Sequence, residues 1–434
     1  MQIRGAFKFI VMKQIVIIGG GFAGVNLAKK LADANGVNVT LVDLNNYNYF
    51  PPLLYQVATG FLDVANITYP FRKLFAGKKN IRFRMASLQR IDTVNNKAIL
   101  SNGELSYDYL VLATGTESNY FGIENIRKHG LPMKTIDDAV NIKNYILQKI
   151  EEATRLDNPD EIKKLTTMVI AGGGPTGVEL AGTIAEMKKN IFRKEYPELA
   201  NQKGEIYLVD ALPTVLAPMS KQSQEYTHKT LVDLDVKVLL NKQVKDYVDN
   251  KVIFADGSEI ETKMLIWTAG VAGRVFDGLP EDIYGRGKRI KVDAFNKVDG
   301  TTNVYAIGDT CIQTTDKNFA EGHPQLAQVA IQQGKNLADN FKAMVAGKPL
   351  EPFKYFDKGS MAIIGRSKAV AEIPSPKLKF KGFIAWMMWL FVHLFSLINF
   401  RNKMQTFFNW MVTLFTKDQS MRTIVRPTVV QDKS

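Results

Sequence analysis

"IVIIGGGFAGVNL", residues 15–27, decides the fold of this chain. An apolar, β-branched run leads into three glycines and a helical pattern, and a second strand pattern, NVTLVD, follows at 38–43. Strand, turn, helix and strand in this order predict a βαβ unit with two parallel strands. The same order returns in "IAGGGPTGVEL" at 170–180, and EIYLVD at 205–210 closes this second unit after a polar insertion at roughly 185–204. We therefore expect an α/β protein with two Rossmann-like domains.

The first unit has the spacing G-x-G-x-x-G, formed by Gly19, Gly21 and Gly24. The first glycine allows a tight turn, the second lets the backbone approach a pyrophosphate, and the third lets the helix pack closely on the strand. The helix N-terminus then directs backbone amides at the phosphates. Asp43 ends the second strand, where it can accept a hydrogen bond from a ribose hydroxyl. These features predict a dinucleotide site; the alternative is that the glycines serve turn geometry alone.

The second unit repeats the spacing with Gly172, Gly174 and Gly177, and Asp210 ends its closing strand. An acidic residue there repels a 2′-phosphate, so the site should prefer NADH to NADPH. The alternative is a turn that is kept only for packing. A nicotinamide gives up electrons as a hydride pair, whereas a bound flavin takes a pair and releases it in other ways. Two turns therefore suggest a resident FAD and a visiting NADH.

Composition limits the class of protein. The chain has 434 residues, 46% of them hydrophobic and 23% charged, which is typical of a folded protein of two or three domains. The net charge of +13 suggests an anionic partner without choosing among nucleic acid, a lipid surface and a charged cofactor. The four histidines lack metal-ligand spacing, so no metal site is predicted. The first twelve residues are interpreted as a lead-in to the first strand, in a chain that begins in the cytoplasm.

Three further motifs carry a family resemblance: VLATG at 111–115, WTAG at 267–270 and VYAIGD at 304–309. Together with the two glycine turns they resemble the flavoproteins with two dinucleotide-binding domains. The resemblance implies that the N-terminal turn binds FAD tightly but non-covalently, and that the central turn binds NADH. It also implies that four residues lie against the cofactors, namely Thr114, Gly115, Gly270 and Asp309.

Within that family, PPLLYQVATG (51–60), AQVAIQQG (327–334) and FDKGSMAIIGRSKAV (356–370) look like type II NADH dehydrogenase, the single-subunit, non-pumping NADH:quinone oxidoreductase. This resemblance implies hydride transfer from NADH to flavin N5, followed by two-electron reduction of a membrane quinone. It implies a catalytic set as well, in which two glutamines meet the quinone and one glutamate lies near the nicotinamide: Gln328, Gln332 and Glu179.

The residues themselves are compatible with these roles. Pro324 suits the first turn of a helix that extends to about Ala346, and Gln328 and Gln332 then share one helical face. Amides can donate to a quinone carbonyl without adding a charge. The alternatives are an ordinary polar helix face for the glutamines, and for Glu179 a first-turn position that the helix dipole favours without any function.

The single cysteine, Cys311, excludes several enzymes of the same fold. Disulfide reductases need a redox dithiol, and sulfide:quinone oxidoreductases need at least two cysteines. Cys311 directly follows the GD motif, so we interpret it as structural. Two other functions stay open: a low-turnover flavoprotein that senses NADH or acts as a scaffold, and a soluble ferredoxin or rubredoxin reductase.

The sequence predicts four segments. We expect an FAD-binding domain in two parts, 1–120 and 286–350, and an NADH-binding domain at 121–285 that includes a linking helix at 135–164. Residues 351–434 are predicted to anchor the protein to a membrane, and the resemblance implies that they also form a homodimer.

The C-terminal region changes character at 382–400, a nearly uninterrupted apolar run of 19 residues. Residues 377–426 contain one acid, Asp418, and eight basic side chains: Lys377, Lys379, Lys381, Arg401, Lys403, Lys417, Arg422 and Arg426. Basic residues beside apolar, Trp-bearing helices predict peripheral attachment to anionic lipid, at the cytoplasmic face of the cell membrane, with no nucleic-acid partner. A single membrane pass and a buried pair of dimer helices are the alternatives.

Overall fold

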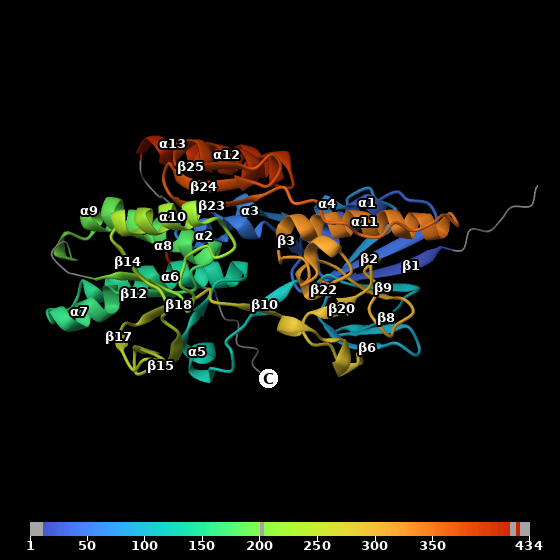
Figure 1. Ribbon diagram of the computed structural model, residues 1–434, viewed down its shortest axis with the longest axis horizontal. Helices are drawn as coiled ribbons and strands as arrows, with labels where there is room; N and C mark the ends of the chain where they lie inside the picture. Colours follow the sequence, from blue (N-terminus) through green and yellow to red (C-terminus); the bar gives the residue numbers. More distant parts are fainter. Residues whose placement is uncertain (1–11, 200–203, 417–421, 426–434) are drawn as a thin grey trace, which may run out of the picture. The chain divides into compact units, whose positions relative to one another are not determined.

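The computed structural model describes residues 12–199, 204–416 and 422–425 (Figure 1). Residues 1–11 of the predicted twelve-residue lead-in lie outside the described residues. The chain divides into two compact units, each assembled from separate segments. Unit 1 contains the chain up to Asn48, with Tyr69–Glu117 and Val271–Asp357; unit 2 contains Tyr49–Thr68, Ser118–Gly270 and the chain from Lys358 onward.

Unit 1 is built on a five-stranded sheet in the order β21-β9-β1-β2-β5, and every pair in it is parallel. The strands are β1 (Lys13–Ile18), β2 (Val37–Asp43), β5 (Ile81–Met85), β9 (Tyr109–Leu112) and β21 (Val304–Ala306). The β1 strand is central and four of its residues are buried, because both faces of a parallel sheet are covered. The predicted first βαβ unit is confirmed, with α1 (Phe22–Leu31) between β1 and β2.

Helices α1 and α11 (Ala327–Val345) lie side by side in unit 1. A Cβ atom at Gly334 would come within 2.4 Å of the Ala23 carbonyl oxygen, so the glycine permits the close contact. The prediction that this helix begins at Pro324 is wrong. The Leu326 N–H donates to the Pro324 carbonyl at 2.9 Å, which makes a tight turn, and the helix begins only after it.

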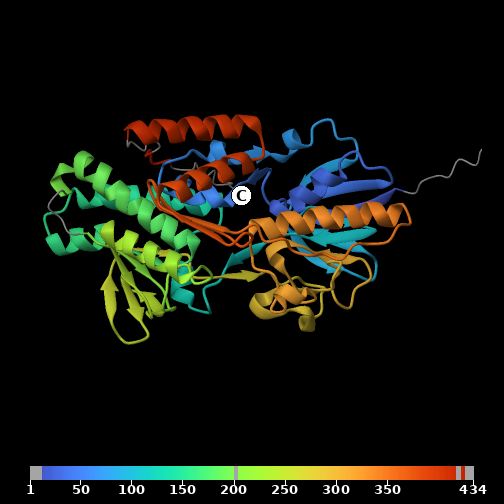
Figure 2. The same cartoon turned by 45° about the horizontal axis from the view of Figure 1, so that its top comes forward.

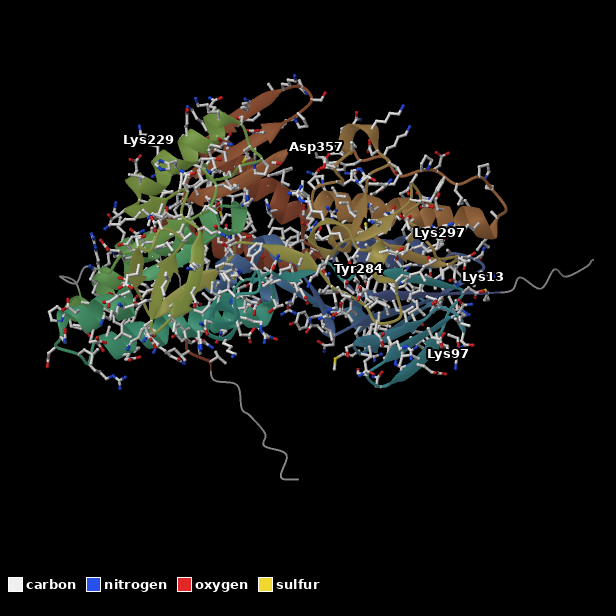
Figure 3. All side chains as sticks on the ribbon, turned by 60° about the horizontal axis from the view of Figure 1, so that its bottom comes forward. Lys13, Lys97, Lys229, Tyr284, Lys297 and Asp357 are labelled. Atoms are coloured by element: carbon white, nitrogen blue, oxygen red, sulfur yellow. The ribbon has the colours of Figure 1, made fainter. Side chains whose placement is uncertain are left out.

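Unit 1 also contains two smaller sheets that lie wholly within its segments. They are the antiparallel β6-β7-β8 (Leu88–Asp92, Lys97–Leu100 and Gly103–Ser106) and the parallel pair β20 (Ile290–Val292) and β22 (Cys311–Gln313). Lys13 and Lys97, both labelled in Figure 3, lie at the surface of unit 1. Lys13 donates to Asp108 at 2.9 Å, and Lys97 donates to Glu104 at 2.6 Å. Exposed pairs of this kind contribute about 0–1 kcal/mol each.

Unit 2 contains the second parallel sheet, in the order β11-β18-β12-β13-β14. Its strands are β11 (Leu131–Pro132), β12 (Met168–Ala171), β13 (Ile206–Val209), β14 (Val236–Leu239) and β18 (Met264–Trp267). Helix α8 (Pro175–Met187) follows β12, as predicted, and α10 (Lys221–Asp233) precedes β14. An antiparallel sheet follows, formed by β15 (Val244–Val248), β16 (Lys251–Phe254) and β17 (Glu259–Glu261).

The predicted linking helix at 135–164 is two helices, α6 (Ile136–Ala153) and α7 (Pro159–Thr166). Thr135 and Asp138 form a capping box that starts α6. The Asn158 side chain caps α7, and Pro159 occupies its first turn. A capping residue followed by proline therefore starts a new helix where we expected a continuous one, and both helices belong to unit 2.

The C-terminal region also belongs to unit 2. It contains an antiparallel sheet, β23-β24-β25 (Ser360–Gly365, Lys368–Ile373 and Leu378–Lys381), followed by α12 (Phe383–Ser396) and α13 (Phe400–Thr416), the red helices of Figure 2. The apolar run at 382–400 is not one helix, because Leu397 adopts an extended backbone and ends α12. Among the helices that the structure describes, none combines the length and the apolar character needed to cross a membrane.

Candidate functional site

The first glycine turn joins β1 to α1 in unit 1. Gly19 has a φ of +105°, and a Cβ atom there would lie 2.4 Å from the Ala113 carbonyl oxygen. A Cβ atom at Gly24 would lie 1.9 Å from the Gly19 carbonyl oxygen. Gly21 differs, because a Cβ atom there would meet no atom within 4 Å. The turn thus has the two close contacts and the one open approach that a pyrophosphate site requires.

Asp43 closes this turn from the end of β2. Its carboxylate accepts the Gly20 N–H at 2.6 Å and the Asn45 N–H at 2.8 Å. Burial raises the pKa of Asp43, while these two backbone donors act in the opposite direction. A carboxylate has about four acceptor positions, so Asp43 retains capacity for a ribose hydroxyl.

The second glycine turn, between β12 and α8 in unit 2, has the same geometry. Gly172 has a φ of +115°, and a Cβ atom there would lie 2.6 Å from the Thr268 hydroxyl oxygen. A Cβ atom at Gly177 would lie 1.8 Å from the Gly172 carbonyl oxygen, whereas one at Gly174 would meet nothing within 4 Å. The open position again falls on the middle glycine.

Asp210 closes the second turn as Asp43 closes the first. Its carboxylate accepts the Gly173 N–H and, at 2.7 Å, the Leu212 N–H. The polar insertion before β13 lengthens the spacing in the sequence without moving the acid, because Asp210 still follows the last residue of β13. One chain therefore has two equivalent glycine turns, each with an acid at its edge. We call them the two cradles: residues 19–24 with Asp43, and residues 172–177 with Asp210.

Further predicted cofactor residues lie in unit 1 near the end of β21. Asp309 lies on a 3-10 helix, Gly308–Thr310, and the Thr114 hydroxyl donates to that of Thr310 at 3.3 Å. Gly115 has a φ of +67°. Gln333 was not predicted from the sequence; it is 1% exposed, and its side-chain oxygen accepts the Gly308 N–H at 2.6 Å. Gln333 lies in the motif AQVAIQQG, which was the available signal, but the catalytic role was predicted for the other two glutamines of that motif, Gln328 and Gln332.

Those two glutamines lie on α11. Gln332 donates to the Phe356 carbonyl at 2.9 Å, and its side-chain oxygen accepts the Phe356 N–H at 3.0 Å. Both ends of its amide are thus bonded to one backbone residue. Gln328 lies one turn earlier on α11 and is half-buried, as Gln332 is. Its predicted contact with a quinone stays a prediction.

Gly270 follows β18 in unit 2. A Cβ atom there would lie 2.7 Å from the Phe121 ring, and its carbonyl oxygen accepts the Asn119 N–H at 3.0 Å. The structure therefore gives Gly270 a packing reason that the sequence did not indicate. Its predicted cofactor contact stays a prediction.

Glu179 has a strongly perturbed carboxyl. It is the fifth residue of α8 and is buried, so the first-turn placement predicted from the sequence is wrong. The helix dipole acts mainly within the first turn and so explains little here. Burial raises the pKa of Glu179 to about 8, although the Ile363 N–H and the Trp389 indole favour the charged form. Perturbed carboxyls of this kind are typical of functional sites.

Cys311 is buried, and its thiol donates to the Gly308 carbonyl oxygen at 3.3 Å. Burial raises the pKa of Cys311 to about 12, so the thiol is neutral and unreactive near neutral pH. This agrees with the structural role expected for it.

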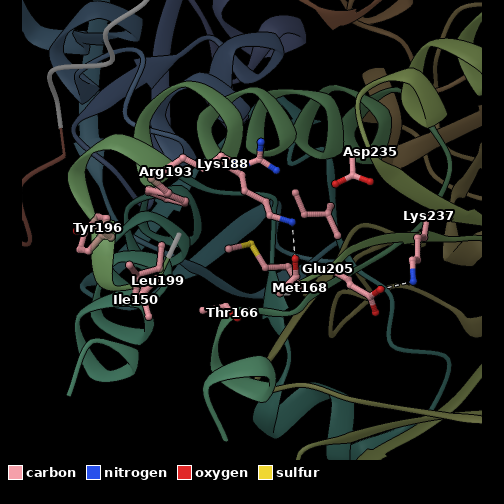
Figure 4. Close-up of a pocket in the computed structure, with 13 residues that line it drawn as sticks. Ile150, Thr166, Met168, Lys188, Arg193, Tyr196, Leu199, Glu205, Asp235 and Lys237 are labelled. Atoms are coloured by element: carbon pink, nitrogen blue, oxygen red, sulfur yellow. Dashed lines mark hydrogen bonds and ion pairs between the residues drawn. The ribbon is translucent and has the colours of Figure 1, made fainter. Parts of the chain in front are cut away.

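A cavity of about 330 Å³ lies at the opposite edge of the unit 2 sheet, where β12 and β13 begin (Figure 4). Lys188 on the π-helical continuation of α8 donates to the Gly204 carbonyl, and Lys237 pairs with Glu205. The glycine turn follows the other end of β12, so this cavity is not the dinucleotide site.

The fold and the two cradles show to which class of protein the chain belongs. Residues 13–334 match the family described as pyridine nucleotide-disulphide oxidoreductase, and the chain belongs to it. The disulfide chemistry in that description is not available to a chain with one cysteine. Residues 358–418 match a second family, described as the NDH2 C-terminal domain.

Proteins of similar sequence show to which group within this class the chain belongs. The chain is 36% identical to the type II NADH:quinone oxidoreductase Ndh of Mycobacterium tuberculosis, over 95% of this chain and 90% of that protein. It is 30% identical to a probable mitochondrial NADH-ubiquinone oxidoreductase of Schizosaccharomyces pombe, over 92% and 82%. Within the class, the chain is a member of the type II NADH:quinone oxidoreductases, which are FAD-dependent.

Solved structures of other proteins have the same fold as this chain. The NDH2 of Plasmodium falciparum in complex with NADH superposes with a TM-score of 0.85 at 22% identity, covering 95% of this chain and 100% of that one. The sulfide:quinone oxidoreductase of Aquifex aeolicus gives a TM-score of 0.69 at 19% identity, covering 94% and 96%.

Proposed function

We propose that this enzyme oxidises NADH and reduces a membrane quinone through a resident FAD, without pumping protons. The observation that carries the proposal is the pair of equivalent cradles, closed by Asp43 and Asp210. FAD, when bound, accepts an electron pair from a nicotinamide and releases it to a quinone. Asp43 and the Gly19–Gly24 turn would hold the FAD, with Asp309 at its ribitol and pyrophosphate.

Asp210 selects the nucleotide that enters unit 2. A carboxylate that already fixes the Gly173 N–H can accept a ribose 2′-hydroxyl, but it repels a 2′-phosphate. NADH is therefore the favoured donor.

Glu179 positions the nicotinamide. With its pKa raised to about 8, the carboxyl is mostly neutral at neutral pH and can donate as well as accept a hydrogen bond. Glu179→Gln should weaken NADH binding or slow flavin reduction. If both quantities are unchanged, this role is wrong.

Gln328 donates to the quinone carbonyl, while Gln332 holds the chain at Phe356. Gln328→Ala should raise the KM for quinone and leave the KM for NADH unchanged. An equal effect on both substrates would contradict the assignment.

The apolar side chains of α12 and α13 attach the enzyme to anionic lipid at the cytoplasmic face of the cell membrane. Phe391 and Phe408 are 63% and 67% exposed, which is unusual for phenylalanine, and Lys377, Lys379 and Lys381 precede α12. Attachment there would bring the enzyme to a lipid-soluble quinone while NADH arrives from water. The enzyme also forms a homodimer, which light scattering in detergent would test.

Stopped-flow mixing tests the central proposal. NADH should bleach the flavin absorbance of the purified enzyme within one turnover, and a second mix with oxidised quinone should restore it. A flavin that stays bleached would instead identify a sensor or scaffold.

A further inference from the structure

Glu179 lies in a buried shell made by separate segments of unit 2. The Ile363 N–H of β23 donates to its carboxyl, and the phenol of Tyr55 on α2 (Leu54–Ala58) is close enough for the carboxyl charge to raise its pKa further. The third member of the shell is Trp389, which comes from α12. The C-terminal region thus contributes directly to the surroundings of this carboxyl.

Trp389 is fully buried, and its indole N–H has no hydrogen-bond partner among the described residues. The N–H lies against the Glu179 carboxyl but outside ordinary hydrogen-bond geometry. Its partial positive charge favours the ionised form of the carboxyl and so lowers the pKa of Glu179. A buried donor without an acceptor is destabilising. An ionised carboxylate is a stronger acceptor than a neutral one, so ionisation of Glu179 would satisfy this donor.

The indole is held on several sides. The His393 ring stacks on it with a centroid distance of 3.9 Å, and His393 Nδ1 bonds to the Trp389 carbonyl oxygen at 2.7 Å. The Tyr55 ring meets it edge-on at 6.3 Å. Trp410 of α13 lies 5.9 Å away and donates to Gln56 at 2.8 Å. Contacts from both C-terminal helices therefore fix where the N–H points.

The opposite face of α12 carries exposed Phe391 and Phe395. One helix thus presents apolar side chains to its surroundings and an unsatisfied N–H to a buried carboxyl.

We propose that Trp389 is a positioning residue for Glu179. The Trp389 indole N–H donates to the Glu179 carboxyl, most strongly when that carboxyl is ionised, and so joins the lipid-facing helix to the nicotinamide site. The proposal rests on the role given to Glu179 under the proposed function. The titratable groups facing this shell are Tyr55 on α2 and His393 on α12, and Glu186 lies two turns further along α8. Burial lowers the pKa of His393 to about 4, so its imidazole stays neutral and puts no charge beside Glu179. His393 therefore affects the carboxyl only through its stacking contact with Trp389.

The test uses full-length enzyme with its flavin bound. The protonated-carboxyl infrared band that disappears in Glu179→Gln is titrated against pH in the wild type and in Trp389→Phe, which keeps an aromatic ring but removes the N–H. We expect the midpoint, about 8 in the wild type, to rise by roughly one pH unit, the size of one charge-assisted hydrogen bond. Trp386→Phe, on the same helix, is the matched control and should not move the midpoint.

An unchanged midpoint in Trp389→Phe, or an equal shift in Trp386→Phe, overturns the proposal. If Trp389→Phe does not fold, benzothienylalanine at position 389 replaces only the N–H by sulfur and gives the same readout. The infrared titration does not depend on turnover. A wild-type enzyme that failed to reduce quinone would therefore contradict the proposed function and leave the Trp389 result separately readable.

Discussion

The Asp43 carboxylate accepts the backbone N–H of Gly20 at 2.6 Å, and Asp210 makes the equivalent bond to Gly173. In each unit an acid at the end of one strand thus holds the glycine turn that follows the neighbouring strand. The acids have two tasks, since they fix the turn and leave acceptor positions for a ribose.

Asp43→Asn should weaken FAD retention. An amide oxygen can accept only part of what the carboxylate accepts, and losing a charge-assisted hydrogen bond of about 1.5–3 kcal/mol corresponds to roughly tenfold or more in affinity. The ratio of flavin to protein absorbance after dialysis measures this. Asp33→Asn, a surface acid of the same unit, should retain its flavin; equal losses in both variants would refute the assignment.

Asp210→Ser should change nucleotide preference. Removing the carboxylate removes the repulsion of a 2′-phosphate, so kcat/KM for NADPH relative to NADH should rise roughly tenfold or more. Steady-state rates with both donors and a water-soluble acceptor give the ratio. A constant ratio would mean that Asp210 does not face the ribose.

Glu179 should make stability fall as pH rises. Its folded-state pKa, about 8, lies above the ordinary value of 4.5, so the folded protein holds the proton more tightly than the unfolded chain. The contribution is complete below pH 4.5 and is lost as pH rises through about 8. Urea unfolding at pH 6 and pH 9 should show a larger loss in the wild type than in Glu179→Gln. Equal losses would place Glu179 in a more polar environment than the structure shows.

Phe391→Glu combined with Phe408→Glu should abolish binding to anionic vesicles. Burying each phenylalanine in lipid stabilises binding by about 1.5–3 kcal/mol, and the two new charges add repulsion. Vesicle sedimentation measures this, and NADH oxidation with a water-soluble acceptor should persist. Val94→Glu, at an exposed valine of unit 1, is the control. Deleting the whole region is less informative, because it also removes buried Trp389.

Gly182→Ala should destabilise unit 2. A Cβ atom at Gly182 on α8 would lie 1.6 Å from the Ile364 carbonyl oxygen of β23, so the backbone must shift at a cost of about 1–3 kcal/mol. Gly285→Ala, where the closest contact would be 3.3 Å, is the control. Thermal unfolding compares the two, and an equal effect would show that α8 and β23 are not tightly packed.

Local patterns were enough to predict both βαβ units, because glycine spacing and strand periodicity act over a few tens of residues. They failed at boundaries that depend on single turns. Pro324 forms a turn before α11, and Asn158 with Pro159 divides the expected helix at 135–164. Each error comes from a local hydrogen bond that overrides a longer helical pattern.

The sequence by itself determined the cradles, their acids and the family, since these depend on residue type at fixed spacing. Only the tertiary structure decided that Glu179 is buried beside Trp389, and that Gln332 bonds to Phe356 while Gln333 bonds to Gly308. Those contacts join segments far apart in the chain. Packing in three dimensions decides which residues meet in these contacts, and no periodicity along the sequence encodes that choice.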